Sequence, residues 1–498
     1  MAALESGHLR GVALKPISSW EKPQMTRMRG LGLVLAACLG LAAPVSAEVK
    51  LPSIFSDHMV LQRDKPIAVW GWDNPGTEVT VSLGEAKATA KADDQGKWSV
   101  SLPAQKANAN GQTLAVKGST EKNYTDVLVG EVWLCSGQSN MEWTVNISAY
   151  PAEEKLNGNH PLIRHIKIPH RPSTKAETDV PSKGWEVASP KTVGEFTAVG
   201  YFFALNLRKD QDFANVPVGL IGSNWGGTRI EPWTTPDGFR SVPAMKDIAD
   251  KLDTFPTKDD KGNINFQTPL ALYNGMIAPF VPYGIRGALW YQGESNNGEG
   301  MLYAEKMKAL INGWRKLWND EAMPFYFVQI APYRYKSTGL PFLWEAQMAA
   351  LKIPGTGMAQ TTDISNINDI HPTNKQEVGR RLANIALAKT YGKQGLALNG
   401  PMFKAVKLEG GKARISFDGA ENGLTTRYGA AVSHFAVAGP DKKFVPAKAV
   451  IEGNEVVVSA EGIPEIAAVR FAWDELAEPS LTNKEGLPAY PFRTDDWK

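Results

Sequence analysis

The stretch at residues 130–143 decides the fold of the middle of the chain, and it reads GEVWLCSGQSNMEW. Its first half holds an apolar run at 132–135 of the kind that forms a buried strand. Its second half turns at once to small and polar residues around Ser139. A buried strand that ends beside a glycine and a serine predicts a sheet edge at which a polar side chain is presented.

The middle of the chain continues this pattern, because apolar strand candidates alternate with segments of helical periodicity. Strands are predicted at 132–135, 218–221, 285–291, 325–330 and 358–361, and helices at 196–208, 301–318 and 375–390. Strand–helix alternation is typical of a parallel sheet with helices on both faces. The fold class predicted for this part is therefore α/β.

Two regions of different character flank the middle. They hold short alternating segments separated by turn sequences such as DNPG at 73–76 and DDQG at 93–96, and such patterns predict β-sandwiches. A chain of 498 residues is also too long for one core. The expected parts are an N-terminal β-sandwich domain at 48–122, an α/β domain at 123–397 and a C-terminal β domain at 398–498.

The N-terminus carries the pattern of a secretory signal peptide. A cationic start near Met28 precedes a short apolar run and small residues up to Ala47. We expect residues 1–47 to be removed, with the true start at Met25 or Met28, and the mature chain to be periplasmic or secreted. A lipid anchor at Cys38 is the rival interpretation. The apolar run is too short for a transmembrane helix, and no later segment is a candidate for one.

Composition excludes one class of partner and favours another. The net charge is +2 and no basic run appears, so a nucleic-acid partner has no electrostatic basis. Fifteen tryptophans favour sugar binding, although tryptophans in cores are common. After signal cleavage Cys135 is the remaining cysteine, so no internal disulfide is expected, and its apolar neighbours argue against a reactive thiol.

Polar, glycine-rich sequences follow four of the predicted strands. They are GQSNM at 137–141, GSNWGGTR at 222–229, QGESN at 292–296 and NDIHP at 368–372. Because ligands bind beyond the carboxyl ends of parallel strands, these segments are expected to line one crevice.

A serine and a histidine in that crevice predict nucleophilic acyl transfer, since a histidine base activates a serine hydroxyl. His371 follows a predicted strand and precedes a predicted helix, whose start Thr373 and Gln376 fit as a capping box. Three other histidines recur every five residues with prolines between them, and this spacing predicts no metal site: His160, His165 and His170.

The nucleophile motif differs from that of α/β-hydrolases, because Met141 stands where G-x-S-x-G has its second glycine. Five segments instead carry a family resemblance: FSDHMVLQRDKPIAVWGW, GEVWLCSGQSNMEW, IGSNWGGTRIEPW, GALWYQGESN and NDIHPTNKQEVGRRLA. Together they resemble the sialate O-acetylesterase family of SGNH-type carbohydrate esterases. The resemblance implies an SGNH, flavodoxin-like catalytic domain and an exported carbohydrate O-acetylesterase that acts on O-acetylated sialic acid.

The resemblance also implies roles for individual residues. Ser139 matches the nucleophile and His371 the general base. The oxyanion hole is expected to use backbone N–H groups and one side chain: Ser139, Gly227 with Gly226 as its rival, and Gln292 or Asn296. The acid that orients the histidine is left open between Asp369, Glu294 and a dyad without an acid, because the broader SGNH position three before the histidine is Asn368 here.

The substrate is the least determined part. Arg229 is expected either to clamp a sialate carboxylate or to brace its own loop. Aromatic side chains are expected to stack on sugar rings: Trp143, Trp290 and Tyr291, with Trp225 and Trp233 as further candidates. No cofactor or metal is expected. The alternatives are an esterase for acetylxylan or another acetylated glycan, a peptidase or lipase with the same triad, and a non-catalytic glycan-binding protein; the oligomeric state is not predicted.

Overall fold

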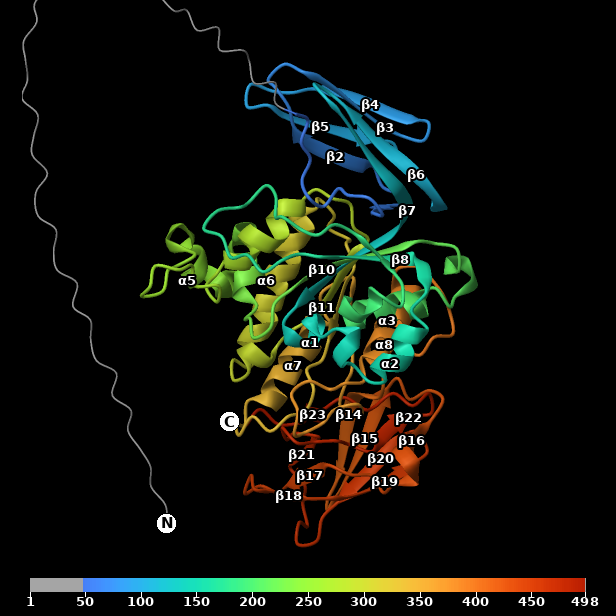
Figure 1. Cartoon of the computed structure of the whole chain (residues 1–498). Coiled ribbons are helices and arrows are strands. Elements are labelled where there is room, and N and C mark those ends of the chain that lie inside the picture. Colours follow the sequence, from blue (N-terminus) through green and yellow to red (C-terminus); the bar gives the residue numbers. More distant parts are fainter. Residues whose placement is uncertain (1–47, 498) are drawn as a thin grey trace, which may run out of the picture. The chain divides into compact units, whose positions relative to one another are not determined.

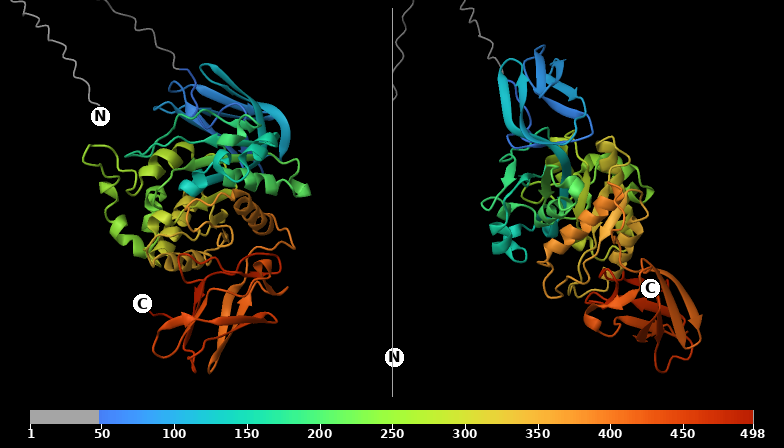
Figure 2. Two further views of the ribbon diagram at one scale, coloured as in Figure 1. Left: turned by 60° about the horizontal axis from the view of Figure 1, so that its bottom comes forward. Right: turned by 90° about the vertical axis from the view of Figure 1, so that its right-hand side faces the viewer.

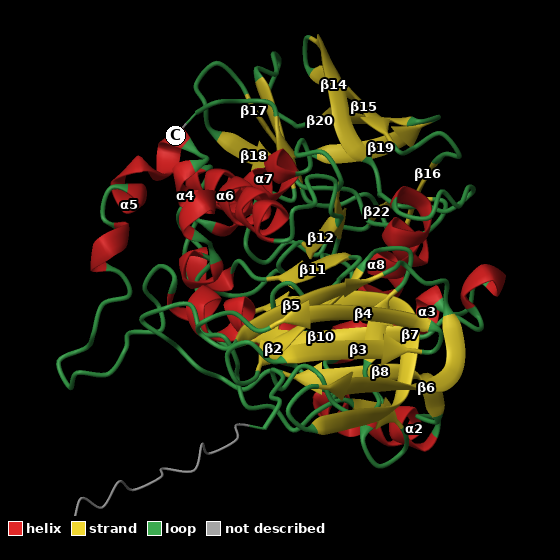
Figure 3. Ribbon diagram, turned by 90° about the horizontal axis from the view of Figure 1, so that it is seen from above, coloured by secondary structure: helices red, strands yellow, loops and turns green. Residues whose placement is uncertain are grey.

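The structure is a computed structural model that describes residues 48–497, so the predicted signal peptide lies outside the described residues. Its centre is a mixed sheet in which all neighbours are parallel except β9 at one edge (Figures 1 and 3). The strand order is β13 (Thr356–Ala359), β12 (Phe325–Val328), β11 (Gly287–Tyr291), β7 (Glu121–Gly137), β10 (Val218–Asn224), β8 (His160–Lys167) and β9 (Glu186–Ala188). The predicted α/β class and its five strands are confirmed, while β8 and β9 were not predicted.

Helices cover both faces of this sheet. They are α1 (Ser139–Glu142), α2 (Pro151–Leu156), α3 (Ala198–Leu207), α4 (Pro236–Arg240), α5 (Lys246–Ala249), α6 (Leu302–Leu317), α7 (Leu340–Ala350) and α8 (Lys375–Lys389). Cys135 of β7 packs against Gly200 of α3. Trp290 of β11 pairs in register with Ser136, the next residue along β7, and contacts Trp314 of α6. Because neighbours along a strand face opposite sides, α3 and α6 lie on opposite faces.

The N-terminal strands are joined to the central sheet by β7 itself. They are β1 (Val60–Gln62), β2 (Ile67–Trp72), β3 (Glu78–Leu83), β4 (Ala86–Lys91), β5 (Lys97–Leu102) and β6 (Asn108–Lys117). The first half of β7 pairs with β6 and is half-exposed, whereas the second half lies between β10 and β11 and is fully buried. The expected domain boundary at residue 122 therefore falls inside one continuous strand.

The C-terminal strands form antiparallel sheets with a hydrophobic core of their own, drawn in orange and red in Figure 2. They are β14 (Met402–Glu409), β15 (Lys412–Asp418), β16 (Leu424–Thr426), β17 (Phe435–Ala438), β18 (Phe444–Pro446), β19 (Lys448–Glu452), β20 (Glu455–Ser459), β21 (Ala468–Phe471), β22 (Leu481–Asn483) and β23 (Phe492–Arg493). This agrees with strands expected at 398–498, although residues 46–498 form one compact unit and the three-domain division stays a prediction.

Candidate active site

Ser139 lies directly beyond the carboxyl end of β7, as the first residue of the single-turn helix α1. The turn depends on Gly137, whose φ of +133° is a conformation that other residues rarely adopt. A Cβ at this position would also lie 2.2 Å from the carbonyl oxygen of Tyr291 on the neighbouring strand. Gly137 is therefore required for β7 to deliver the serine to this edge of the sheet.

His371 meets Ser139 across the crevice. Its Nε2 lies 2.8 Å from the serine Oγ, so the two residues form a hydrogen-bonded dyad although 232 positions separate them. Burial lowers the pKa of His371, and the nearby ammonium of Lys375 lowers it further, while Asp369 opposes both effects. The imidazole is therefore held neutral at neutral pH, the state in which Nε2 accepts the serine proton.

The two acid candidates occupy different positions. An Asp369 Oδ1 lies 3.7 Å from His371 Nδ1, which is longer than a hydrogen bond, and it accepts the backbone N–H of His371 at 2.9 Å. Glu294 instead accepts a 2.6 Å hydrogen bond from Asn140, and burial raises its pKa. Within the described part of the chain Glu294 makes no hydrogen bond to His371, so proximity favours Asp369.

The backbone of the second loop lies next to the serine, since a Cβ on Gly226 would be 3.3 Å from Ser139 Cβ. The N–H of Gly226 donates to Glu142 Oε2 at 2.7 Å and is thereby engaged. The N–H groups of Ser139 and Gly227 donate to no acceptor among residues 48–497. Of the two rival glycines, Gly227 is therefore the one with a donor available for an oxyanion.

The side-chain donors predicted for the oxyanion hole are engaged in other hydrogen bonds. Gln292 and Asn296 are both fully buried. The Nε2 of Gln292 donates to the Thr228 carbonyl at 3.1 Å and to Asn296 Oδ1 at 2.7 Å, and the Nδ2 of Asn296 donates to Glu231 and Glu299, each at 3.1 Å. Their amide hydrogens therefore tie the third loop to the second and to Glu299.

Arg229 belongs to a network of alternating charges. Its Nη2 forms ion pairs with Glu231, at 3.2 Å, and with Glu299. Lys306 Nζ contacts the same two carboxylates, each at 2.6 Å. Of the two roles open for Arg229, the network therefore favours bracing of the loops, although 40% of its side chain stays exposed.

The predicted aromatic platform is only partly where it was expected. Trp143 stacks on the His371 ring at 4.5 Å between centroids and so packs against the dyad itself. Trp290 and Tyr291 are 1% and 0% exposed, and Trp233 is equally buried. Trp290 and Tyr291 lie on a strand that is enclosed between two helical layers, and their rings pack in the core.

Trp225 is occupied on both of its faces. Its ring stacks on His170 at 4.3 Å and on Phe266 at 4.6 Å, with interplanar angles of 5° and 8°. His170 Nε2 contacts Glu142 Oε1 at 2.8 Å, and Glu142 also holds the Gly226 N–H. Both faces of the Trp225 ring are thus covered, and the stack lies next to the nucleophile turn.

Sequence reasoning missed two charged side chains that hold the loops together. Glu142 ties the second loop to α1 by accepting the Gly226 N–H, and Lys375 donates to Asn140 Oδ1 at 2.5 Å. Both lie inside the quoted motifs, which was the available signal. The predicted capping box of α8 is also wrong, since the side chain of Asn374 accepts the N–H of Glu377 instead.

Neither a metal site nor a thiol site competes with this dyad. Among the described residues no group of histidine, cysteine and carboxylate side chains is arranged to hold a metal ion. His160 and His165 lie on β8, whereas His170 lies beyond its end. Cys135 is fully buried, and burial raises the pKa of its thiol, as the sequence predicts.

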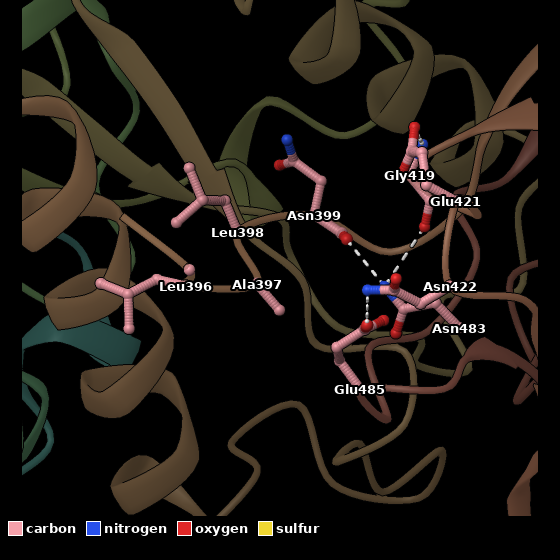
Figure 4. A pocket seen from close by; sticks show the side chains of 10 residues that line it. Leu396, Ala397, Leu398, Asn399, Gly419, Glu421, Asn422, Asn483 and Glu485 are labelled. Atoms are coloured by element: carbon pink, nitrogen blue, oxygen red, sulfur yellow. Dashed lines mark hydrogen bonds between the residues drawn. The ribbon is translucent and has the colours of Figure 1, made fainter. Parts of the chain in front are cut away.

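A separate cavity of about 410 Å³ lies at the start of the C-terminal region (Figure 4). It is lined by residues 395–399 together with Glu421, Asn422, Asn483 and Glu485. Asn422 Nδ2 donates to Glu485 at 2.6 Å, and Asn483 Nδ2 donates to the Asn399 carbonyl at 3.1 Å. None of the dyad residues lines it.

In residues 48–497 no helix is long and apolar enough to cross a bilayer.

Known proteins resemble this chain in both sequence and fold. The family model "Carbohydrate esterase, sialic acid-specific acetylesterase" matches residues 129–388. Sialate O-acetylesterases of Pongo abelii and Homo sapiens are each 31% identical over 422 residues, which cover 76% of this chain and 78% of each relative. The crystal structure of a carbohydrate acetylesterase from Xanthomonas citri superposes with a TM-score of 0.82 at 38% identity, covering 90% of this chain and 100% of that one.

Proposed function

The chain belongs to the family of sialic acid-specific carbohydrate acetylesterases, and on this premise we propose that it releases acetate from O-acetylated sugars by a serine acyl-enzyme mechanism. The observation that carries the mechanism is the 2.8 Å contact between Ser139 Oγ and His371 Nε2. A neutral histidine at this distance is placed to act as a general base.

In the proposed first step, His371 Nε2 takes the proton of Ser139 while Oγ bonds to the acetyl carbonyl carbon. The negative charge that develops on the carbonyl oxygen is met by the N–H groups of Ser139 and Gly227. Preorganised donors of this kind each contribute about 10²–10³-fold to turnover. The bond to the sugar oxygen then breaks, and that oxygen leaves with the proton from His371.

In the second step, water attacks the acetyl–Ser139 ester, and His371 again serves as base and then returns the proton to Ser139. Acetate leaves, and the enzyme is restored. Asp369 is the proposed partner of the imidazolium, because its carboxylate lies on the Nδ1 side of the ring. We propose that neither step requires a metal or an organic cofactor.

The test of this proposal is acetate release by the mature chain, 48–498, with Ser139→Ala as its control. Wild type should release acetate from acetylated sugars, and Ser139→Ala should fold normally with a rate lower by about 10⁴-fold or more. Substantial activity in Ser139→Ala would exclude the acyl-enzyme scheme. If the wild type released no acetate from any acetylated sugar, the result would favour a non-catalytic glycan-binding protein.

Two sugars are candidates for the substrate. The names of the relatives from Pongo abelii and Homo sapiens support O-acetylated sialic acid. The pairing of Arg229 with Glu231 and Glu299 supports a neutral acetylated glycan such as acetylxylan, since a sialate carboxylate would have to compete with both. Rates on 9-O-acetyl sialic acid and on acetylated xylo-oligosaccharides distinguish the two candidate substrates. A preference for the sialate that is lost in Arg229→Ala would show that Arg229 binds the sialate carboxylate.

Export is also proposed, on the cationic, apolar and small-residue pattern that ends at Ala47. N-terminal sequencing of protein recovered outside the cytoplasm should begin at Glu48. A chain that is lipidated at Cys38 would instead remain in the membrane fraction.

A further inference from the structure

A buried ammonium lies directly beneath the dyad. Lys375 is the first residue of α8 and is 0% exposed, which is rare for a lysine. Its Nζ donates to Asn140 Oδ1 at 2.5 Å, and it lies over the rings of Tyr291 and Trp143 at 5.2 and 5.8 Å. Keeping a charge in such a place costs free energy, so its retention calls for a local role.

The ammonium fixes which way the Asn140 amide points. A protonated lysine has donors and no acceptor, so below its pKa of about 7 it can face only the carbonyl end of the amide. The NH₂ end must then face the other way, where two acceptors stand: Glu294 Oε1 at 2.6 Å and the carbonyl of Ile370 at 3.0 Å. A flipped amide would bring its oxygen against both acceptors and its NH₂ against the ammonium.

The Asn140 amide connects the two halves of the dyad. Asn140 follows Ser139 in α1, and Ile370 precedes His371. The hydrogen bond between Nδ2 and the Ile370 carbonyl therefore ties the residue next to the nucleophile to the residue next to the base. A misplacement of about 1 Å between such groups costs about 10²-fold in rate.

We propose that Lys375 is a positioning residue, which locks the orientation of the Asn140 amide and thereby keeps the Ile370–His371 segment docked on the nucleophile turn. This inference rests on the proposed function, because it assumes that Ser139 and His371 perform the reaction. Lys375 does not contact the dyad atoms itself; it positions them through Asn140, and its charge acts on His371 through space.

The charge of Lys375 gives this role a distinctive signature. Burial lowers its pKa to about 7, and the carboxylates of Glu294 and Asp369 oppose that effect. Lys375 in turn lowers the pKa of His371, against Asp369. The Tyr291 phenol beside it is also buried, which raises its pKa. Removing the ammonium should therefore raise the pKa of His371 and move the acidic limb of kcat/KM to higher pH.

The experiment compares Lys375→Met with Lys375→Arg and Lys389→Met, by pH profiles on p-nitrophenyl acetate. Lys389 is the control because it lies at the other end of α8, where its Nζ donates to the Thr356 carbonyl at 2.8 Å. We expect Lys375→Met to lower kcat by about 10²-fold with KM nearly unchanged, and to move the acidic limb upward. Lys375→Arg should recover part of the wild-type kcat and return the acidic limb to its wild-type pH. Lys389→Met should have the kcat and the acidic limb of the wild type.

Two outcomes would overturn the inference. One is a Lys375→Met enzyme whose kcat and whose acidic limb of kcat/KM are both those of the wild type. The other is a Lys375→Met enzyme with a lowered kcat, an acidic limb at the wild-type pH, and no recovery of kcat in Lys375→Arg. A lysine with a purely structural role would give that result. If Lys375→Met fails to fold, Asn140→Asp is the replacement test, because it keeps an acceptor for the ammonium but loses both N–H donors. Full activity in Asn140→Asp would also overturn the inference.

Failure of the proposed function would be visible separately, in the wild type. A fluorophosphonate probe should label wild-type Ser139 and not Ser139→Ala. Wild-type protein that neither reacts with the probe nor hydrolyses the ester would refute the proposed function. A labelled, active wild type beside an unaffected Lys375→Met would refute the role of Lys375 alone.

Discussion

The nucleophile turn and the histidine loop meet at one hydrogen bond, but they are held in different ways. Ser139 follows a strand that is buried between β10 and β11 and hydrogen-bonded to both, so the main chain itself sets its position. His371 lies in a loop after β13, a strand at the edge of the central sheet. Polar side chains from several elements hold that loop.

Three contacts show how dispersed the support of the histidine loop is. Arg381 of α8 grips Asp363 with two hydrogen bonds of 2.6 and 2.7 Å. Arg427, from the C-terminal region, donates to the Asp363 carbonyl at 2.9 Å, and Ser365 donates to Glu478 at 3.0 Å. The nucleophile is thus fixed by the sheet, whereas the base is fixed by side chains, some of them from the C-terminal β region.

The largest effect should come from removing the base. His371→Ala is expected to lower kcat/KM by about 10⁴-fold or more, and Ser139→Ala combined with it should be no worse than either alone, since residues that act as a unit are not additive. Steady-state acetate release measures this. Additive losses would mean that the two residues act independently.

The next largest effect should come from a change in the nucleophile turn, and it should be a loss of folding stability. Gly137→Ala is expected to destabilise the fold by about 3 kcal/mol or more, because the new Cβ meets the Tyr291 carbonyl at 2.2 Å in a positive-φ conformation. Chemical denaturation measures the loss. Gly453→Ala is the control, since Gly453 also has a positive φ, +65°, but no atom within 4 Å of an added Cβ. An equal loss of stability in Gly453→Ala would mean that the positive φ, and not the contact with Tyr291, causes the effect.

A smaller effect should separate the two carboxylates. Asp369 raises the pKa of His371, so Asp369→Asn should lower that pKa and move the acidic limb of kcat/KM to lower pH, opposite to Lys375→Met. We expect a loss of about tenfold in kcat, because the contact is 3.7 Å long and 49% of the aspartate side chain is exposed. Glu294→Gln should leave the limb in place; the reverse result would make Glu294 the orienting acid.

The smallest effect should come from the C-terminal region. Arg427→Met removes the donor to the Asp363 carbonyl, and the loss of one such hydrogen bond corresponds to about fivefold in kcat. Hydrogen exchange should quicken in residues 361–371 and stay unchanged in 137–142. Equal changes in both segments would show that the two are not held separately.

The sequence predicts the dyad well and its supports poorly, for a physical reason. Ser139 and His371 each follow an apolar strand candidate, so the geometry of parallel sheets is enough to bring them together. The supports depend on side-chain contacts between distant residues, such as the 235 positions between Asn140 and Lys375. No local pattern encodes that pairing, and Lys375 reads as an ordinary first-turn lysine.

Gln292, Asn296, Trp290 and Tyr291 were predicted at the site, and the structure shows all four side chains buried. Motif position shows that a residue matters near the site, but it does not show whether the side chain points into the crevice or into the loop beneath it. The long strand β7 was missed for another reason. Its half-exposed start and its buried end have different patterns, and these resemble two strands of two domains.

The fully buried Cys135 has a practical consequence for studies of opening. It is the single cysteine of the described residues, four positions before Ser139, with its Sγ closed off by Gly200 of α3. A thiol reagent can reach it only when the central sheet separates from that helix. The labelling rate of the mature chain under native conditions would therefore report, without any engineered probe, how often the scaffold behind the nucleophile comes apart.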